Sequence, residues 1–430
     1  MPFDLSKGAP QRIAIIGGGI AGLSSAWLLG RHHQVTVYEA APRWGGHART
    51  VMAGRNGDVA VDTGFIVFNH ANYPHLTSLF HALDVPIKKS DMSFAVSLDS
   101  GRVEFAMNTL GSIFGQRRNM VDPRFYSMLT QILRFNAQAE SVVAAYPGLS
   151  IAQLLDHMRL GRRFREHYLY ALCGAIWSTP RGQIGDFPAE ALLRFLRNHA
   201  LLSREGQHQW WTVGGGSISY VQRLTQALRQ MGVALRVGTP VQSVTRAADG
   251  VTLRAAGSTP EVFDQVIFAN HADQALALLG DPTPPETQAL GAIRFQENRA
   301  VLHSHTGVMP QRRACWSSWV YRTDRSLGAE RNVGISYWMN RLQSLPDSDP
   351  LFVTLNPEIP LPDAAIYDET TFHHPVFDGP ALQAQSQIAQ MQGDNHTWFA
   401  GAWLRNGFHE DGFASAMRIA RRLLPLGVRP

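Results

Sequence analysis

Lysine, cysteine and long apolar runs are scarce in this sequence. Lysine occurs only at Lys7, Lys88 and Lys89, so the 39 basic residues are nearly all arginine. The two cysteines, Cys173 and Cys315, are too few for a disulfide framework or a clustered metal site, and they fit a reducing compartment. No uninterrupted apolar run reaches about 18 residues, so we expect no membrane-spanning helix.

Charged residues are also few. They make up 17% of the 430 residues, against 45% hydrophobic residues, which is typical of a globular protein with a sizeable core and two or three domains. The formal net charge of +5 can attract nucleic acid, anionic lipid or an acidic substrate, but no nucleic-acid-binding motif accompanies it. The first motif begins near Ile13, where cleavage of a signal peptide would destroy it. We therefore expect a cytoplasmic protein that binds neither nucleic acid nor metal.

The stretch 12–50 carries the most informative pattern of the chain. A short apolar run, Ile13 to Ile16, is typical of a buried parallel strand and leads directly into a G-x-G-x-x-G sequence. Gly17 permits a tight turn, Gly19 lets the backbone approach a pyrophosphate, and Gly22 lets the following helix pack on the strand. The N–H groups and the positive dipole end at the helix start can then hold phosphates.

An acidic residue ends the second strand of this pattern. Glu39 lies 17 residues beyond Gly22, where a carboxylate can accept hydrogen bonds from a ribose diol. Strand, glycine turn, helix and acid together predict a dinucleotide site, and a glycine-rich turn in another α/β protein is the alternative. The residues predicted to bind the dinucleotide in this stretch are Gly17, Gly19, Ile20, Ala21, Gly22, Glu39 and Ala40.

The next residues resemble a known family. The run Arg43-Trp44-Gly45-Gly46-His47-Ala48-Arg49-Thr50 is similar to the R-x-G-G-R-x-x-T segment of the flavin-containing amine oxidoreductase superfamily. The resemblance implies that the dinucleotide is FAD, with Arg43, Gly45 and Gly46 lining its diphosphate and flavin. A guanidinium and two bare backbones suit a diphosphate. His47 stands where the family usually has arginine, and it is included among the implied FAD contacts.

Later segments extend the resemblance to the C-terminus. A D-x-G segment passes close to the flavin ring in the family, and 62–65 is similar to it, although a turn glycine beside a core phenylalanine is the alternative. A family strand offers its backbone to the adenine at the position of Val241. The stretch 398–416, which includes Gly407, is similar to the closing FAD motif. The FAD contacts implied by these segments are Gly64, Phe65, Val241, Gly401, Glu410, Asp411, Gly412 and Phe413.

The element pattern predicts an α/β protein. We expect a Rossmann-like FAD-binding domain of the glutathione-reductase type, with an inserted α+β substrate domain of the amine-oxidase type. The predicted FAD-binding domain comprises 8–90, 209–290 and 390–430, and the substrate domain comprises 91–208 and 291–389. Helical patterns within the substrate domain cover 123–146, 150–161, 163–176 and 189–202, and strand-like patterns dominate 291–374.

The resemblance also bears on the chemistry. Amine-oxidising members place two aromatic residues before the flavin and a lysine near its reactive nitrogen. Phe408 falls at one aromatic position, but no lysine follows Lys89, which argues against amine oxidation because arginine cannot readily act as a neutral base. His373 and His374 precede the closing motif, where a histidine can act as a general base near neutral pH, with a surface or packed histidine as the alternative. The predicted catalytic residues are His373, His374 and Phe408.

The whole chain is most similar to a bacterial FAD/NAD(P)-binding group that resembles the flavin domain fused to plant cyclopropane fatty acid synthases. The H-P-V-F stretch and the G-F-H-E-D-G stretch carry this likeness. It implies an unsaturated or methyl-branched acyl-lipid substrate that is desaturated or oxidised by hydride transfer to flavin. An amine oxidase that produces peroxide is the first alternative. The second is an FAD-containing lipid isomerase or hydratase without net redox turnover.

One arginine-rich stretch raises the question of a membrane partner. A basic helix pair with an aromatic edge can lie on an anionic membrane surface, and an ordinary solvated face is the alternative that we favour. The residues of this stretch are Met158, Arg159, Leu160, Arg162, Arg163, Phe164, Arg165 and Tyr168.

Overall fold

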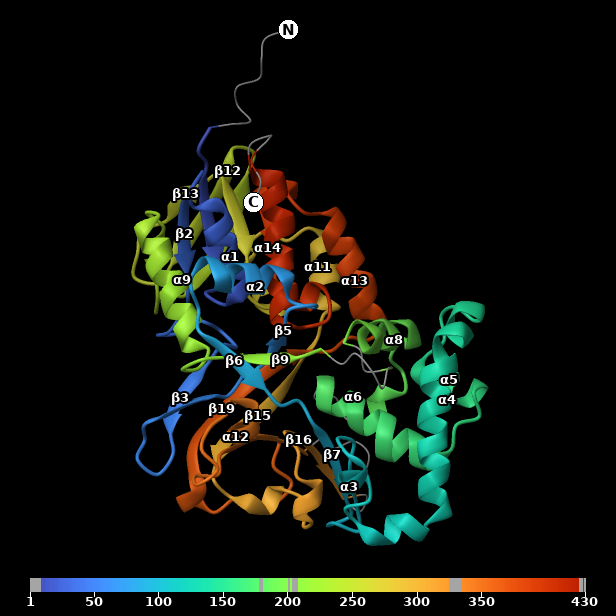
Figure 1. Cartoon of the computed structure of the whole chain (residues 1–430). Helices are drawn as coiled ribbons and strands as arrows, with labels where there is room; N and C mark the ends of the chain where they lie inside the picture. Colours follow the sequence, from blue (N-terminus) through green and yellow to red (C-terminus); the bar gives the residue numbers. More distant parts are fainter. Residues whose placement is uncertain are drawn as a thin grey trace.

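The structure is a computed structural model, and it describes residues 9–177, 181–199, 202, 208–324, 334–424 and 428. One region is built around a parallel sheet near both ends of the chain. The other is built around a larger mixed sheet with a block of helices at its side (Figure 1). No helix of the described residues is long and apolar enough to cross a bilayer.

A five-stranded parallel sheet forms the core of the first region. Its central strand is β1 (Arg12–Ile16), whose apolar residues are buried on both faces, as expected of a parallel strand covered on two sides. Ile13 and Ile15 pack on one side of the sheet, and Ala14 and Ile16 pack on the other. The order is β10 (Ala234–Arg236), β2 (Gln34–Tyr38), β1, β14 (Gln265–Phe268), β20 (Thr397–Phe399).

Two different layers cover this sheet. Helices from distant parts of the chain pack on the side of Ile13 and Ile15, namely α1 (Ile20–Leu29), α2 (Pro74–Ala82), α9 (Ile218–Gln230) and α14 (His409–Leu423). The opposite layer consists of β11 (Val241–Ala247), β12 (Gly250–Ala255), β13 (Glu261–Phe263), α10 (Ala272–Leu278), α11 (Pro284–Gly291) and α13 (Gly379–Gln390). Because both faces are covered, the carboxyl ends of the strands form the open edge at which ligands bind in such sheets.

Two small sheets connect the regions. One is the hairpin of β3 (Thr50–Ala53) and β4 (Val59–Asp62), and the other has the order β5 (Phe68–Asn69), β9 (Trp210–Val213), β6 (Ile87–Ser90). Asp62 links these pieces, because its buried carboxylate accepts hydrogen bonds from the Thr50 hydroxyl (2.6 Å), the Ser217 N–H (2.8 Å) and the Gln343 amide (3.1 Å).

The second region contains a seven-stranded sheet. Its neighbours pair antiparallel except for β16 and β7, which pair in parallel. The order is β19 (Ile366–Pro375), β15 (Phe295–His303), β18 (Phe352–Leu355), β17 (Gly334–Trp338), β16 (Trp319–Thr323), β7 (Phe94–Leu98), β8 (Val103–Ala106). The short helix α12 (Met339–Leu342) follows β17.

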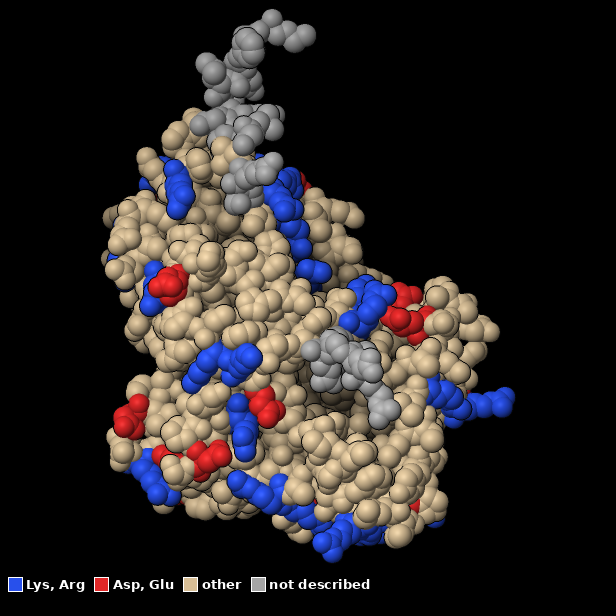
Figure 2. All heavy atoms as spheres, in the orientation of Figure 1, with Lys and Arg blue, Asp and Glu red and all other residues tan. Residues whose placement is uncertain are grey.

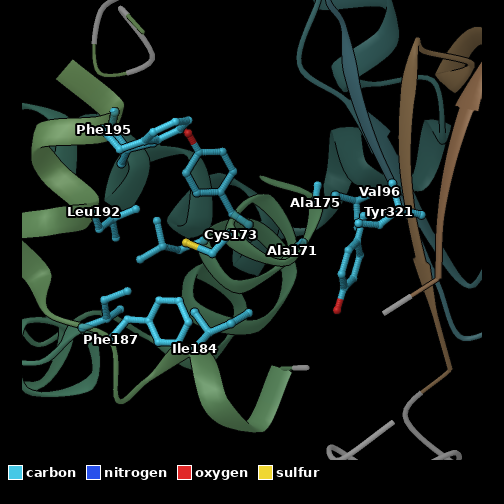
Figure 3. Packing of buried hydrophobic residues seen from close by; sticks show 14 of the residues in the cluster. Val96, Ala171, Cys173, Ala175, Ile184, Phe187, Leu192, Phe195 and Tyr321 are labelled. Atoms are coloured by element: carbon cyan, nitrogen blue, oxygen red, sulfur yellow. The ribbon is translucent and has the colours of Figure 1, made fainter. Parts of the chain in front are cut away.

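A helical block lies beside this sheet. Ala171 and Ala175 of α6 face Val96 and Tyr321 of the sheet, and small residues at the contact let the helix approach closely (Figure 3). The block consists of α3 (Leu110–Ile113), a 3-10 turn (Arg117–Val121), α4 (Pro123–Ala145), α5 (Ile151–His157), a π-helical turn (Phe164–Leu169), α6 (Tyr170–Trp177), α7 (Arg181–Ile184) and α8 (Ala189–Asn198).

The predicted α/β fold with a Rossmann-like domain is confirmed, and the predicted domain boundaries remain a prediction. The membrane face considered at 158–168, which was the less favoured of the two interpretations, finds no support in the structure. Its apolar members are between 0% and 8% exposed, because they pack inward and close the core of the helical block. These members are Met158, Leu160, Phe164 and Tyr168.

Candidate functional site

The turn between β1 and α1 forms one end of the site. Gly17 has a φ of +116°, and a Cβ there would lie 2.7 Å from the Ala269 carbonyl oxygen. A Cβ on Gly22 would lie 1.8 Å from the Gly17 carbonyl oxygen, so only glycine permits this packing of helix on turn. The helix begins at Ile20, next to Ala21, without a side-chain cap and without an acid in its first turn. Its positive end is therefore not neutralised locally, which suits a phosphate.

A second glycine loop lies against the first. The Gly45 N–H donates to the Gly18 carbonyl oxygen (2.8 Å), and a Cβ on Gly46 would lie 3.1 Å from the Gly19 Cα. The Arg43 guanidinium holds this loop closed by donating to the carbonyl oxygen of Gly46 (2.8 Å). Two bare backbones thus approach each other, with a guanidinium beside them, as a diphosphate site requires.

Glu39 ends β2 beside the same turn. One carboxylate oxygen accepts the Gly18 N–H (2.6 Å) and the other accepts the Ala41 N–H (2.7 Å), so Ala40 lies within the loop that this carboxylate holds. The Thr239 N–H donates to the Glu39 carbonyl oxygen (2.8 Å), which brings the start of β11 and its first residue, Val241, to this position. The residues predicted for the ribose and adenine therefore lie in one place.

The C-terminal segment meets the N-terminal one at this end. A Cβ on Gly412 would lie 2.8 Å from a methyl carbon of Ile20, so α14 and α1 touch close to their first turns. The Gly401 N–H donates to the Ser415 hydroxyl (2.9 Å), which fixes the strand end of β20 to α14. Gly407, with a φ of +90°, lies in the connecting loop.

Three predicted FAD contacts near this end use their side chains for protein structure. The Glu410 carboxylate accepts the N–H groups of His75 and Leu76 (both 3.0 Å) and so caps the start of α2. Asp411 accepts the Phe408 N–H (3.0 Å), and burial raises the pKa of its carboxyl to about 6. Phe413 is a buried core residue. These residues therefore have only their backbone groups left to contact a cofactor.

Asn270 supplies an independent sign of a ligand. It lies two residues beyond the end of β14, beside Gly17, and its side-chain oxygen is buried without a hydrogen-bond partner in the described structure. Buried polar atoms without partners are rare in folded proteins, so an unmet acceptor at a glycine-lined strand edge points to a bound donor. Together with the uncapped helix start, the glycine loops and Glu39, it makes the residues at this edge fit FAD.

Histidine rings from three segments gather at the other end. His47 follows the second glycine loop, His271 follows β14, and His373 and His374 lie in β19. The His47 ring lies 5.9 Å from that of His271 and 5.7 Å from that of His374, and the His271 and His373 rings are 6.3 Å apart. The carbonyl oxygen of His47 accepts the Phe65 N–H (2.9 Å). We refer to His47, His271, His373 and His374 as the histidine cluster.

A glycine segment and two phenylalanine rings pack against this cluster. A Cβ on Gly64 would lie 2.0 Å from the His47 carbonyl oxygen, so the predicted D-x-G segment passes directly beside the cluster. Phe372 stacks on His47 at 5.0 Å between ring centroids, and Phe295 stacks on His271 at 4.3 Å. The described residues contain no group of three or more His, Cys, Asp or Glu side chains arranged to hold a metal ion.

Three rings of the cluster, those of His47, His271 and His374, are held neutral. Burial, followed by the neighbouring histidines, lowers the pKa of His47 and of His271 to about 4 and that of His374 to about 3. All three rings nevertheless keep some accessible surface. At neutral pH they are therefore uncharged rings that a ligand can contact, and their proton affinity is low for a general base.

A chain of hydrogen bonds fixes the tautomer of His374. The Arg299 backbone N–H can only donate, and it donates to the side-chain oxygen of Asn356 (3.0 Å). The Asn356 amide group therefore donates to the Asn298 oxygen (2.8 Å), and the Asn298 amide group faces His374 Nδ1 (2.9 Å). Nδ1 must accept, so the single proton of the neutral ring lies on Nε2. His374 is thereby a hydrogen-bond donor toward the site rather than a base.

Aromatic rings continue the wall on the side of the helical block. Phe408, at the start of α14, stacks on Phe195 of α8 with ring centroids 5.3 Å apart. Phe195 stacks in turn on His199 (4.1 Å), which stacks on Trp210 of β9 (6.0 Å). On the neighbouring side, His409 is stacked on Phe65 at 3.8 Å. The predicted aromatic position is thus part of a column of rings that joins the two regions.

The sequence reasoning missed three residues here. His271 lies three residues beyond the last residue of β14, at the ligand-binding edge of the sheet, and its position just after an apolar strand-like run could have marked it as a candidate. Asn298 and Asn356 lie in or next to strands of the second region and carry no motif. Their part in the site depends on the pairing of β15 with β18 and β19, which a single sequence does not reveal.

Fold and site define a Rossmann-type flavoprotein oxidoreductase. The family profile described as flavin-containing amine oxidoreductase matches residues 20–308, about two thirds of the chain. The chain belongs to this family, and FAD is its cofactor. The predicted family is thereby confirmed, and the narrower likeness to the flavin domain of cyclopropane fatty acid synthases stays a prediction.

Individual relatives match over the motif alone or over the fold alone. An L-amino-acid oxidase of Crotalus adamanteus is 57% identical over 42 residues, which is 10% of this chain and only 8% of that protein. A CLA-producing fatty acid isomerase from P. acnes has a TM-score of 0.70 at 14% identity, with 97% of this chain and 99% of that chain covered. Cyclohexylamine oxidase from Brevibacterium oxydans has a TM-score of 0.69 at 15% identity, with 96% and 99% covered. At such identities the two structures establish the fold.

Proposed function

We propose that this FAD-dependent oxidoreductase desaturates or oxidises a fatty acyl chain. The supporting observation is the uncharged wall at the ring end of the site, which consists of neutral histidines and stacked aromatic rings. Of the described lysines, Lys89 is exposed and Lys88 is half-buried with Asp62 as its electrostatic partner, so neither ammonium belongs to that wall. An apolar chain meets no desolvated charge there.

Desaturation requires few polar groups from the protein. Desaturation breaks two C–H bonds on neighbouring carbons and forms a C=C bond, with one hydrogen leaving as a hydride and the other as a proton. FAD supplies the acceptor for the hydride and its electron pair. The glycine loops, Arg43 and the start of α1 would hold the diphosphate, and Glu39 would hold the ribose. The proton needs a neutral acceptor, and the histidine cluster supplies uncharged imidazoles.

The His374 tautomer divides the roles within the cluster. With Nδ1 engaged by Asn298, the Nε2–H of His374 orients a polar group of the ligand by hydrogen bonding. Proton uptake then falls to His47 or His271, whose neutral rings can accept a proton but are weak bases because burial lowers the pKa of each to about 4. One of the structural relatives is a fatty acid isomerase, so a protein with this fold can act on a lipid. Its likeness to this chain is one of fold alone.

Anaerobic mixing tests the proposal. The holoenzyme is mixed with phospholipids that carry unsaturated or methyl-branched acyl chains, and the oxidised flavin absorbance is followed while mass spectrometry weighs the acyl product. We expect bleaching of the flavin together with an acyl chain two hydrogens lighter. A panel of primary and secondary amines serves as the matched comparison.

The alternatives give different outcomes. Flavin bleaching with amines but not with lipids, followed by peroxide production once oxygen is admitted, would establish the amine oxidase that the family name suggests. A shifted double bond at unchanged mass, without net flavin reduction or oxygen uptake, would establish an isomerase. A product heavier by one water would establish a hydratase.

A further inference from the structure

Exposed apolar side chains concentrate at one end of the helical block. Of the ten exposed large hydrophobic residues in the described structure, four lie between 110 and 126. Leu110 is 72% exposed, Met120 54%, Val121 82% and Tyr126 45%. In a monomeric protein such side chains are normally scattered, so a local concentration marks an interaction surface.

These side chains form one patch. The Tyr126 hydroxyl donates to the Met120 carbonyl oxygen (3.0 Å), and the Tyr126 ring lies 5.8 Å from that of Phe114. The Phe114 N–H donates to the Leu110 carbonyl oxygen (3.1 Å), so the patch joins α3, the 3-10 turn and the start of α4. We call Leu110, Met120, Val121 and Tyr126 the apolar patch.

An arginine-lined cavity of about 630 Å³ adjoins the patch. Its only lining carboxylate, that of Asp122, is paired with Arg163 at 2.7 Å. The guanidinium groups of Arg102 and Arg118 form no ion pair with any residue in the described part of the chain. Blue side chains gather along the lower edge of the molecule, under α3, in Figure 2. The lining arginines are Arg102, Arg118, Arg124, Arg162 and Arg163.

We propose that the apolar patch and this cavity together dock the protein on an anionic lipid bilayer. The apolar side chains would enter the boundary between headgroups and acyl chains, and the arginines next to them would pair with lipid phosphates. The strength of such binding rises with the buried apolar area and with the electrostatic attraction to anionic lipid. Guanidinium groups pair well with phosphate oxygens, and the cavity offers several in one place. The proposal does not depend on the reaction at the flavin.

Charge argues against a second copy of the chain as the occupant. A twofold contact places the same patch of both copies face to face, so the unpaired arginines of one copy would lie opposite those of the other. Like charges brought together in this way oppose association. An anionic bilayer instead offers the complementary charge.

Vesicle binding of the FAD-loaded full chain tests the proposal. Flotation is measured with phosphatidylcholine vesicles and with vesicles that contain phosphatidylglycerol as a substantial fraction, at low and high salt. We expect binding to the anionic vesicles that weakens as salt rises. Val121→Glu should lower the partition coefficient about tenfold, and R102E/R118E by at least as much, at about fivefold per arginine removed.

Matched controls come from the opposite end of the molecule. Val262→Glu replaces another exposed valine, 57% exposed on β13, and Arg254→Glu replaces an exposed arginine of β12. Both should bind vesicles as the unchanged protein does, and the flavin spectrum and melting temperature of every variant report on folding. Equal binding to neutral and anionic vesicles, or equal losses in patch and control variants, would overturn the proposal.

Two further outcomes would also reject it. Inorganic phosphate that binds the arginine cavity, with no vesicle binding, would make the cavity a site for a free anion. Light scattering that shows a dimer, which Val121→Glu converts to a monomer without any effect on vesicles, would make the patch an interface between copies.

Discussion

Main-chain groups build the diphosphate end of the site, whereas side-chain rings build its other end. At the first end the decisive features are glycines, an uncapped helix start and backbone N–H groups, and they lie within a short stretch of sequence. At the second end the rings come from three segments that are far apart in the sequence, and the tautomer of His374 depends on neighbours across a sheet. The first kind of site can be read from a motif, whereas the second kind exists only after folding.

The largest effect is expected from a substitution at the diphosphate end of the site. Gly22→Val would place a side chain where even a Cβ lies 1.8 Å from the Gly17 carbonyl oxygen, so α1 cannot pack on β1. We expect a colourless protein that does not retain FAD and melts at a much lower temperature. Gly379→Ala is the control, because a Cβ there meets no atom within 4 Å. A yellow, stable Gly22→Val protein would show that this turn does not hold the cofactor.

The next prediction addresses the ring end. Asn298→Asp replaces the donor that faces His374 Nδ1 with an acceptor, so the ring proton should move to Nδ1 and the pKa of His374 should rise. We expect turnover to fall about tenfold with an added acid limb in its pH profile. Nitrogen NMR of the holoprotein reads the tautomer directly, and Asn395→Asp makes the same chemical change at an exposed position. Nδ1 protonation in the unchanged protein would refute the proposed relay.

A smaller effect tests whether Glu410 is structural. Glu410→Gln weakens the acceptor that caps α2 and should lower stability by about 1–2 kcal/mol, measured by denaturant unfolding. Glu369→Gln, which removes one partner of an exposed pair with Arg299, should change stability by at most about 0.5 kcal/mol. If Glu410→Gln instead loses FAD without losing stability, its carboxylate contacts the cofactor.

The smallest expected effect is a dependence of the free energy of unfolding on pH. The pKa values of His47, His271 and His374 are lowered by folding, so the unfolded chain binds more protons than the folded one between about pH 6.5 and 4. Stability from these neutral rings is fully present above their unfolded pKa and is lost as pH falls through this window. His271→Gln should flatten the slope of unfolding free energy against pH. An unchanged slope would mean that the ring is not buried neutral.

Features that depend on local spacing could be predicted from the sequence, whereas features that depend on contacts between distant segments could not. The strand, turn and helix at 12–29 and the acid at Glu39 were predictable because each follows from local spacing. The part of Glu410 in capping α2 was not, because its partners His75 and Leu76 are remote in sequence. The membrane face considered at 158–168 finds no support, because a basic pattern does not say which way its apolar residues point. The patch at 110–126 lies instead where chain direction changes and no helical period marks it.

The pairing of β15 with β18 has a chemical consequence. Asn356 follows β18 directly with a φ of +47°, and its N–H donates to the Arg299 carbonyl oxygen (2.8 Å) as the next rung of the ladder would. That rung holds the Asn356 side chain where its oxygen accepts the Arg299 N–H, the bond that starts the relay. Slippage of that ladder by one position would point the amide elsewhere and release the imidazole to exchange its proton freely between both nitrogens. The reactivity of the His374 ring therefore depends on the register of β15 and β18. Loop changes that shift this register can alter that reactivity even when every site residue is kept.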